Sequence, residues 1–137
     1  MLRSVRKLVD ACVWLALLNK KDKFHERSLI FLKNVHEGNN VQIVIPSHTM
    51  IEVNIKLKKI KKTGKWDGVS PFEAVGPEFY PIDVEFIRKT QKLYDWLGEL
   101  GSQDAIYAAI AYLENIPLVT FDEGFKKVND KIILEFI

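Results

Sequence analysis

Apolar residues are grouped along the chain in two patterns, one typical of buried strands and the other of helices. Short apolar runs predict strands at 7–10, at 41–46 ("VQIVIP"), at 116–121 ("IPLVTF") and at 131–137 ("KIILEFI"). Apolar residues at helical spacing predict helices over 11–20, 24–38, 47–62, 83–97 and 102–115. Strands that alternate with helices indicate an α/β domain, with a mostly parallel central sheet flanked by helices on both faces.

The segment from Thr63 to Pro81 follows neither pattern. It contains three glycines and three prolines and has no sustained period, so it predicts a long irregular excursion. Such loops in compact domains tend to be functional or mobile. The whole chain of 137 residues has the length of one domain, and we expect a single domain over 1–137.

Composition narrows the class of protein only moderately. Hydrophobic residues make up 47% and charged residues 28%, which is an ordinary globular balance. A net charge of +2 is too small to imply nucleic acid by itself. The single cysteine, Cys12, excludes an internal disulfide and fits a reducing cytosol. The apolar run 11–18 is too short to span a bilayer, so we expect a cytoplasmic protein without a membrane partner.

Four acidic residues occupy matching places in this pattern. Asp10 ends the first predicted strand and Asp122 ends "PLVTF", while Glu52 and Asp104 lie in the first turns of predicted helices. Parallel sheets bind ligands outside the carboxyl ends of their strands, where helix N-termini also point. If the sheet is parallel there, all four carboxylates face one edge.

Each acid also has a purely structural interpretation. Asp10 and Asp122 could cap helices, and Thr49 with Glu52 has the spacing of a capping box. Asp104 could simply favour the positive end of a helix dipole. For any one acid these alternatives stay open.

Taken together, the four acids favour a metal site. Clustered carboxylates repel one another unless a cation lies among them, and no Lys, Arg or His falls within two residues of Asp104 or Asp122. Oxygen ligands select Mg²⁺ or Mn²⁺, and zinc is disfavoured because Cys12 and the three histidines lack ligand-like spacing. Such an ion supplies both the nucleophile and the charge stabilisation that cleavage of a phosphodiester needs.

Four segments resemble the PIN-domain ribonucleases, particularly the VapC-like toxins. They are "LVDACVWLALLN", "IVIPSHTMIEV", "SQDAIYAAIA" and "PLVTFDEGF", and they occur in the family's order over nearly the whole chain apart from 63–81. The resemblance implies that Asp10, Glu52 and Asp104 are the core catalytic ligands of one or two divalent ions, and that Asp122 completes the group. It also implies hydrolysis of RNA by activated water.

The resemblance assigns one further residue and shows one departure. Thr120 matches a small hydroxyl residue that can orient a carboxylate, although a threonine is also common in strands. The family usually has a hydroxyl or amide residue just after the first aspartate, where this chain has Ala11 and Cys12. This departure puts in doubt a hydrogen bond to one of the predicted metal ligands, but it does not affect the assignment of the carboxylates.

Most of the basic bias is concentrated after Glu52, in "KLKKIKKTGKW". A basic groove with an aromatic residue for base stacking is typical of RNA binding, although a solvated helix end with Trp66 in the core is the alternative. The candidate RNA-binding residues are Lys56, Lys58, Lys59, Lys61, Lys62, Lys65 and Trp66.

The sequence therefore predicts a metal-dependent endoribonuclease, a toxin restrained by a separate antitoxin protein. The alternative is an inactive PIN-like domain that binds RNA or a partner, which Ala11 and Cys12 favour. A phosphoacceptor signalling domain is set aside because it requires adjacent acids after the first strand. The resemblance also implies a homodimer, with Trp14, Phe24 and Phe31 as the candidate apolar surface.

Overall fold

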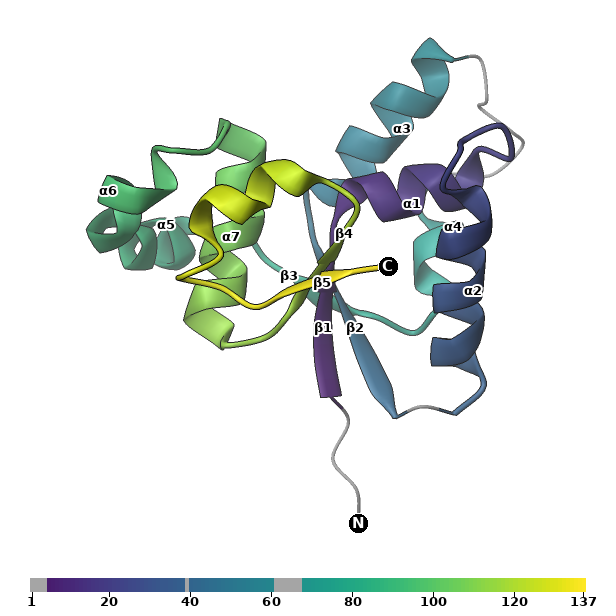
Figure 1. The fold of residues 1–137 in the computed structure, drawn as a ribbon, viewed down its shortest axis with the longest axis horizontal. Helices are drawn as coiled ribbons and strands as arrows, with labels where there is room; N and C mark the ends of the chain where they lie inside the picture. The colour runs from purple at the N-terminus through teal and green to yellow at the C-terminus, as the bar shows by residue number, and fades with distance from the viewer. Residues whose placement is uncertain (1–4, 39, 61–67) are drawn as a thin grey trace.

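A fully parallel five-stranded sheet forms the centre of the molecule, with helices on both faces (Figure 1). The computed structural model describes residues 5–38, 40–60 and 68–137. The strand order is β3-β2-β1-β4-β5, which confirms the predicted α/β class and parallel sheet. The strands are β1 (Val5–Val9), β2 (Val41–Pro46), β3 (Glu78–Tyr80), β4 (Leu118–Thr120) and β5 (Leu134–Phe136).

The helices are divided between the two faces of the sheet. One side carries α1 (Ala11–Leu18), α2 (His25–His36) and α4 (Ser70–Glu73), and α3 (Thr49–Lys59) projects past α1 (Figure 1). The other side carries α5 (Val84–Thr90), η1 (Gln91–Leu93), α6 (Tyr94–Leu97), α7 (Ser102–Glu114) and η2 (Glu123–Val128). Among the described helices, none combines the length and apolar character that a membrane span requires.

The core explains why the apolar runs become strands. Leu8, Val44 and Leu118 are fully buried on adjacent central strands, because helices cover both faces of a parallel sheet. Small residues bring α7 close to this sheet: Ala108, Ala109 and Ala111 are buried.

The predicted dimer surface is wrong for Trp14 and Phe31, because both side chains pack inside one chain. Trp14 is fully buried and contacts Phe72 edge-on, with ring centroids 5.1 Å apart. Phe31 is buried as well, and Phe24 stacks on Phe121. The sequence shows that these residues are apolar. Only the tertiary structure shows that residues of α4 and of the loop after β4 pack against them.

The described part of the predicted irregular segment, residues 68–81, is more ordered than predicted. Within it, α4 and β3 form, and β3 pairs with β2 through Val44 and Glu78, Ile45 and Phe79, and Pro46 and Tyr80. Residues 63–67 lie outside the described part of the chain. A three-residue edge strand followed by Pro81 carries almost no local signal, so its pairing with a distant strand decides it.

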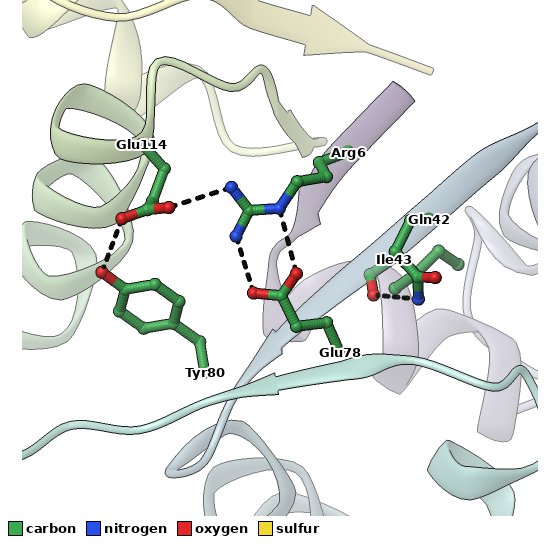
Figure 2. A network of polar contacts seen from close by, with 6 residues as sticks. All are labelled: Arg6, Gln42, Ile43, Glu78, Tyr80 and Glu114. Atoms are coloured by element: carbon green, nitrogen blue, oxygen red, sulfur yellow. Dashed lines mark hydrogen bonds and ion pairs between the residues drawn. The ribbon is translucent and has the colours of Figure 1, made fainter. Parts of the chain in front are cut away.

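Arg6 ties this edge strand to the rest of the sheet. Its guanidinium contacts the Glu78 carboxylate through two nitrogens, at 3.0 and 2.6 Å, and the Glu114 carboxylate at 2.9 Å (Figure 2). Tyr80 donates to the other oxygen of Glu114 at 3.0 Å. Residues of β1, β3 and the last turn of α7 are therefore joined in one polar network.

The long predicted helix 83–97 is also divided. Asp83 opens α5 as expected, and its carboxylate accepts a hydrogen bond from the Phe86 amide at 2.9 Å. The remaining residues form the short η1 and α6, separate from α5.

Candidate active site

The four predicted acids come from elements that meet at the carboxyl edge of the sheet. Asp10 directly follows β1, Asp122 lies two residues after the end of β4, and Glu52 lies in the first turn of the helix after β2. Asp104 lies in the first turn of α7. Because β2, β1 and β4 are parallel neighbours, their carboxyl ends share one edge.

Asp10 is the most enclosed of the four carboxylates, with a residue exposure of 5%. Its Oδ2 accepts a hydrogen bond from the Thr120 hydroxyl at 2.8 Å and another from the Cys12 thiol at 3.2 Å. Burial raises the pKa of Asp10 to about 6, those two donors oppose the rise, and the Asp104 and Glu52 carboxylates add to it.

Cys12 supplies a hydrogen bond to Asp10, although the sequence here lacks the hydroxyl or amide residue that is usual in the family. Its thiol donates to Asp10, and its sulfur accepts a weak hydrogen bond from the Phe121 amide at 3.5 Å. Burial and the nearby Asp10 charge raise the pKa of this thiol to about 12, so it stays protonated as a donor near neutral pH.

Thr120 connects two of the acids. Besides donating to Asp10, its fully buried hydroxyl oxygen accepts a hydrogen bond from the backbone amide of Asp122 at 2.9 Å. The interaction joins residues 110 positions apart in the sequence. This geometry supports the predicted orienting role and is more than a strand threonine requires.

Glu52 is held by two different groups. The Tyr107 hydroxyl donates to its Oε1 at 3.4 Å, and the Lys56 ammonium pairs with its Oε2 at 3.3 Å. Its side chain is 10% exposed. The capping-box interpretation is wrong, because His48 occupies the N-cap position and the Thr49 hydroxyl bonds to Tyr107.

Asp104 is influenced by all the charges at the centre of this edge. Burial raises the pKa of its carboxyl group, the Asp122 and Glu52 carboxylates raise it further, and Lys56 lowers it. The sequence neighbours of Asp104 include no cation, but the fold brings Lys56 to it from α3. Part of the counter-charge is thus supplied by the protein.

Helix capping explains only one of the acids. Asp10 occupies the N-cap position of α1, yet its side chain makes no cap hydrogen bond. Asp122 does cap, because its Oδ1 accepts from the Gly124 amide at 2.8 Å at the start of η2. Asp104 lies inside the first turn of α7, whose N-cap is Gly101.

The donor chemistry of this edge fits a hard divalent ion. Burial raises the pKa values of Asp10 and Asp104, and the neighbouring carboxylates raise them further by a mutual repulsion that a divalent cation would relieve. Among the described residues, however, no three His, Cys, Asp or Glu side chains are grouped closely enough to hold an ion as they stand. The carboxylates are the oxygen ligands that such an ion prefers, but the described side chains do not surround an ion in their present positions.

Two residues near the acids were missed by the sequence analysis. Tyr107 is fully buried, and its ring lies 5.2 Å from that of His48 between centroids. Both ring nitrogens of His48 are buried and have no hydrogen-bond partner among the described residues, and burial lowers the pKa of this histidine. The spacing of three residues between Asp104 and Tyr107, which places both on one helix face, was the available signal for Tyr107.

The predicted RNA-binding residues are only partly placed. Lys56, Lys58 and Lys59 lie in the last turns of α3 and are exposed. Lys61, Lys62, Lys65 and Trp66 lie outside the described residues. A basic end of α3 therefore directly follows the helix turns that hold Glu52.

Comparison with known structures identifies the fold. VapBC2 from Rickettsia felis, solved bound to a DNA fragment from its promoter, matches with a TM-score of 0.70 and 21% identity over 97% of this chain and 99% of that chain. The Mycobacterium tuberculosis toxin VapC20, which cleaves the sarcin-ricin loop, matches with a TM-score of 0.66 and 16% identity over 93% and 96% of the two chains. FitAcB from Neisseria gonorrhoeae matches with a TM-score of 0.63 and 14% identity over 93% and 95%.

Sequence comparison gives the family. No curated protein sequence matches the chain significantly. The sequence model of the PIN domain matches residues 7–131, which include all four acids, β2, β3, β4 and most of β1. Proteins of this family are generally nucleases. The chain therefore belongs to the PIN domain family, with the fold of the VapC toxins.

Proposed function

We propose that this protein is an endoribonuclease that depends on one or two Mg²⁺ or Mn²⁺ ions. The observation that carries the proposal is the buried Asp10 carboxyl, whose pKa is raised to about 6 by burial and by two neighbouring carboxylates. Like charges that repel one another around a buried carboxyl destabilise a protein, so their presence at the ligand-binding edge of the sheet favours a function that needs the charge.

In this proposal Asp10, Glu52 and Asp104 hold the ion, and Asp122 completes the group directly or through water. When bound, a divalent ion activates water and neutralises charge on a phosphate. Thr120 and Cys12 hold Oδ2 of Asp10 and so limit rotation of its carboxyl group. Lys56 has to release Glu52 before both oxygens of that carboxylate can turn to an ion.

RNA is the substrate class that best fits the surroundings of the acids. The exposed Lys58 and Lys59 lie one to two turns beyond Glu52 on α3, where they can contact the phosphates of a bound strand. The similar toxin VapC20 cleaves the sarcin-ricin loop, which supports a cleavage function of the same kind here.

An inactive RNA-binding or partner-binding domain is the second candidate. Two observations favour it: Lys56 already forms an ion pair with Glu52, and among the described residues no three potential ligands are grouped closely enough to hold an ion. In that case the lysine takes the place of the metal as a permanent counter-charge.

We also propose an antitoxin partner and a homodimer. The similar structures of VapBC2 and FitAcB are complexes, and the similar VapBC-5 from Mycobacterium tuberculosis is a member of the VapBC family of toxin-antitoxin systems. These similarities support a protein partner that suppresses cleavage. The homodimer rests on the resemblance to VapC-like toxins.

Cleavage of labelled RNA in Mn²⁺, Mg²⁺ or EDTA tests the proposed function. We expect cleavage with either ion, none in EDTA, and a loss of several orders of magnitude in Asp104→Asn, because the charge that fixes the ion is removed. Asp95→Asn, at an exposed acid on α6, is the matched control and should cleave normally. Wild-type protein that binds RNA but leaves it intact under all three conditions would support the inactive domain.

A further inference from the structure

The hydroxyl of Tyr107 is buried at the edge of the sheet where the acids lie, and it contacts the Glu52 carboxylate directly. Tyr107 follows Asp104 by three residues on α7, and its side chain is fully buried at the edge of the sheet. Its oxygen lies 2.7 Å from the Thr49 hydroxyl and 3.4 Å from Oε1 of Glu52. Burial raises the pKa of this hydroxyl, and the nearby Asp10 and Glu52 charges raise it further, so Asp10 also lies near it.

Packing alone does not require this oxygen. The Tyr107 ring fills the core beside His48, and a phenylalanine ring would occupy the same volume. A hydroxyl buried without partners is unfavourable, whereas this one, on α7, has two partners on α3, Thr49 and Glu52. The arrangement fits a relay in which Thr49 donates to Tyr107 and Tyr107 donates to Glu52, because a phenol has one hydrogen and can also accept.

We propose that Tyr107 is a positioning residue, whose hydroxyl orients the Glu52 carboxylate and fixes α3 and α7 relative to Asp10. This inference rests on the proposed metal-dependent function. The second oxygen of Glu52 is paired with the partly exposed Lys56, so Tyr107 holds the buried side of the carboxylate while Lys56 holds the outer side. When Lys56 leaves, the Tyr107 hydrogen bond remains to aim Glu52.

Tyr107→Phe tests this role with little change in volume. We expect its affinity for Mn²⁺, measured by calorimetry, to fall by about 10- to 100-fold, the range for loss of a hydrogen bond behind a metal ligand. Cleavage at low Mn²⁺ should fall similarly and recover when Mn²⁺ is raised, while the KM for RNA stays unchanged. Tyr112→Phe is the control, since Tyr112 lies on the same helix, is half exposed and packs on Trp96.

A metal-free measurement tests the contact itself. In EDTA, Tyr107→Phe should lower the melting temperature, and the shift should be smaller in a Glu52→Ala background, where the acceptor is already gone. Thr49→Val should reduce Mn²⁺ affinity less than Tyr107→Phe, because the donor to Glu52 remains. If Tyr107→Phe is poorly folded, Thr49→Val still tests the relay, and wild-type affinity in that variant overturns it.

The outcomes separate this inference from the proposed function. If Glu52→Ala loses Mn²⁺ affinity and Tyr107→Phe keeps it, Tyr107 has no positioning role and the metal-dependent function stands. If Glu52→Ala binds Mn²⁺ as the wild type does, the metal site and the inference both fail. Equal melting shifts from Tyr107→Phe in both backgrounds would show that the hydroxyl does not act on Glu52.

Discussion

At the scale of single residues, Asp10 predicts how the metal-free protein responds to pH. Its pKa is raised from 3.8 to about 6, so the folded state binds a proton more tightly than the unfolded chain does. The folded protein holds the extra proton between about pH 4 and pH 6, so the free energy of unfolding decreases as pH rises through this window. The loss is on the order of 3 kcal/mol above the window, from about 1.4 kcal/mol per pKa unit.

Urea unfolding in EDTA between about pH 4 and pH 7 checks this prediction against Asp10→Asn. Wild type should lose stability relative to the variant as pH rises. Asp104 has a raised pKa and contributes with the same sign, whereas Glu114 has a lowered pKa and contributes with the opposite sign. Both groups remain in the variant, so the difference reports mainly on Asp10. A difference that does not change with pH would contradict the prediction.

At the scale of elements, the basic end of α3 predicts how RNA binding depends on salt. Changing Lys58 and Lys59 at the end of α3 to Gln, together with Lys61 and Lys62 next in the sequence, should weaken binding and flatten its salt dependence. Each lost phosphate contact lowers the slope of log K against log salt by about 0.7 for a single strand. Affinity should be measured in EDTA over a range of salt concentrations, so that cleavage does not interfere.

The matched control for this experiment lies on the opposite side of the sheet. Lys89 and Lys92, on α5 and η1, are exposed, and their change to Gln should leave the slope unchanged. An unaltered slope in the variant with all four lysines changed to Gln would mean that these lysines are solvated charges that do not contact RNA.

At the scale of the whole molecule, a homodimer remains a prediction, and the structure changes where to look for its surface. Trp14 and Phe31 are buried in the chain's own core, whereas Ile51 and Ile55 on α3 are 64% and 51% exposed and one turn apart. Light scattering at micromolar concentration should give twice the 15.8 kDa chain mass. Ile51→Lys with Ile55→Lys should give the monomer, because charges replace apolar side chains in the contact.

Ile87→Lys, at an exposed position on α5, is the control and should leave the mass unchanged. Circular dichroism should show that both variants keep their helices. A wild-type mass of one chain at tens of micromolar would contradict the dimer. If the variant with Ile51→Lys and Ile55→Lys is still a dimer, the dimer surface lies elsewhere.

The sequence by itself determined the features that depend on local order. Buried runs such as "VQIVIP" and helical spacing in 102–115 indicated the alternating elements, because a parallel sheet covered on both faces needs continuous apolar strands. Asp10 and Asp122 stand at strand ends, so the parallel arrangement alone brings them to one edge. The metal assigned to that edge stays a prediction.

Only the tertiary structure decided the contacts between distant residues. Thr120 reaches Asp10 across 110 positions, and Tyr107 reaches Glu52 across 55. Lys56 is a counter-charge for Asp104 only because the fold brings α3 near α7. The strand β3 forms because it pairs with β2. No local pattern encodes these contacts, because each depends on two segments meeting in the folded core. The physical reason is that burial decides the environment of a side chain, and burial is a property of the whole molecule.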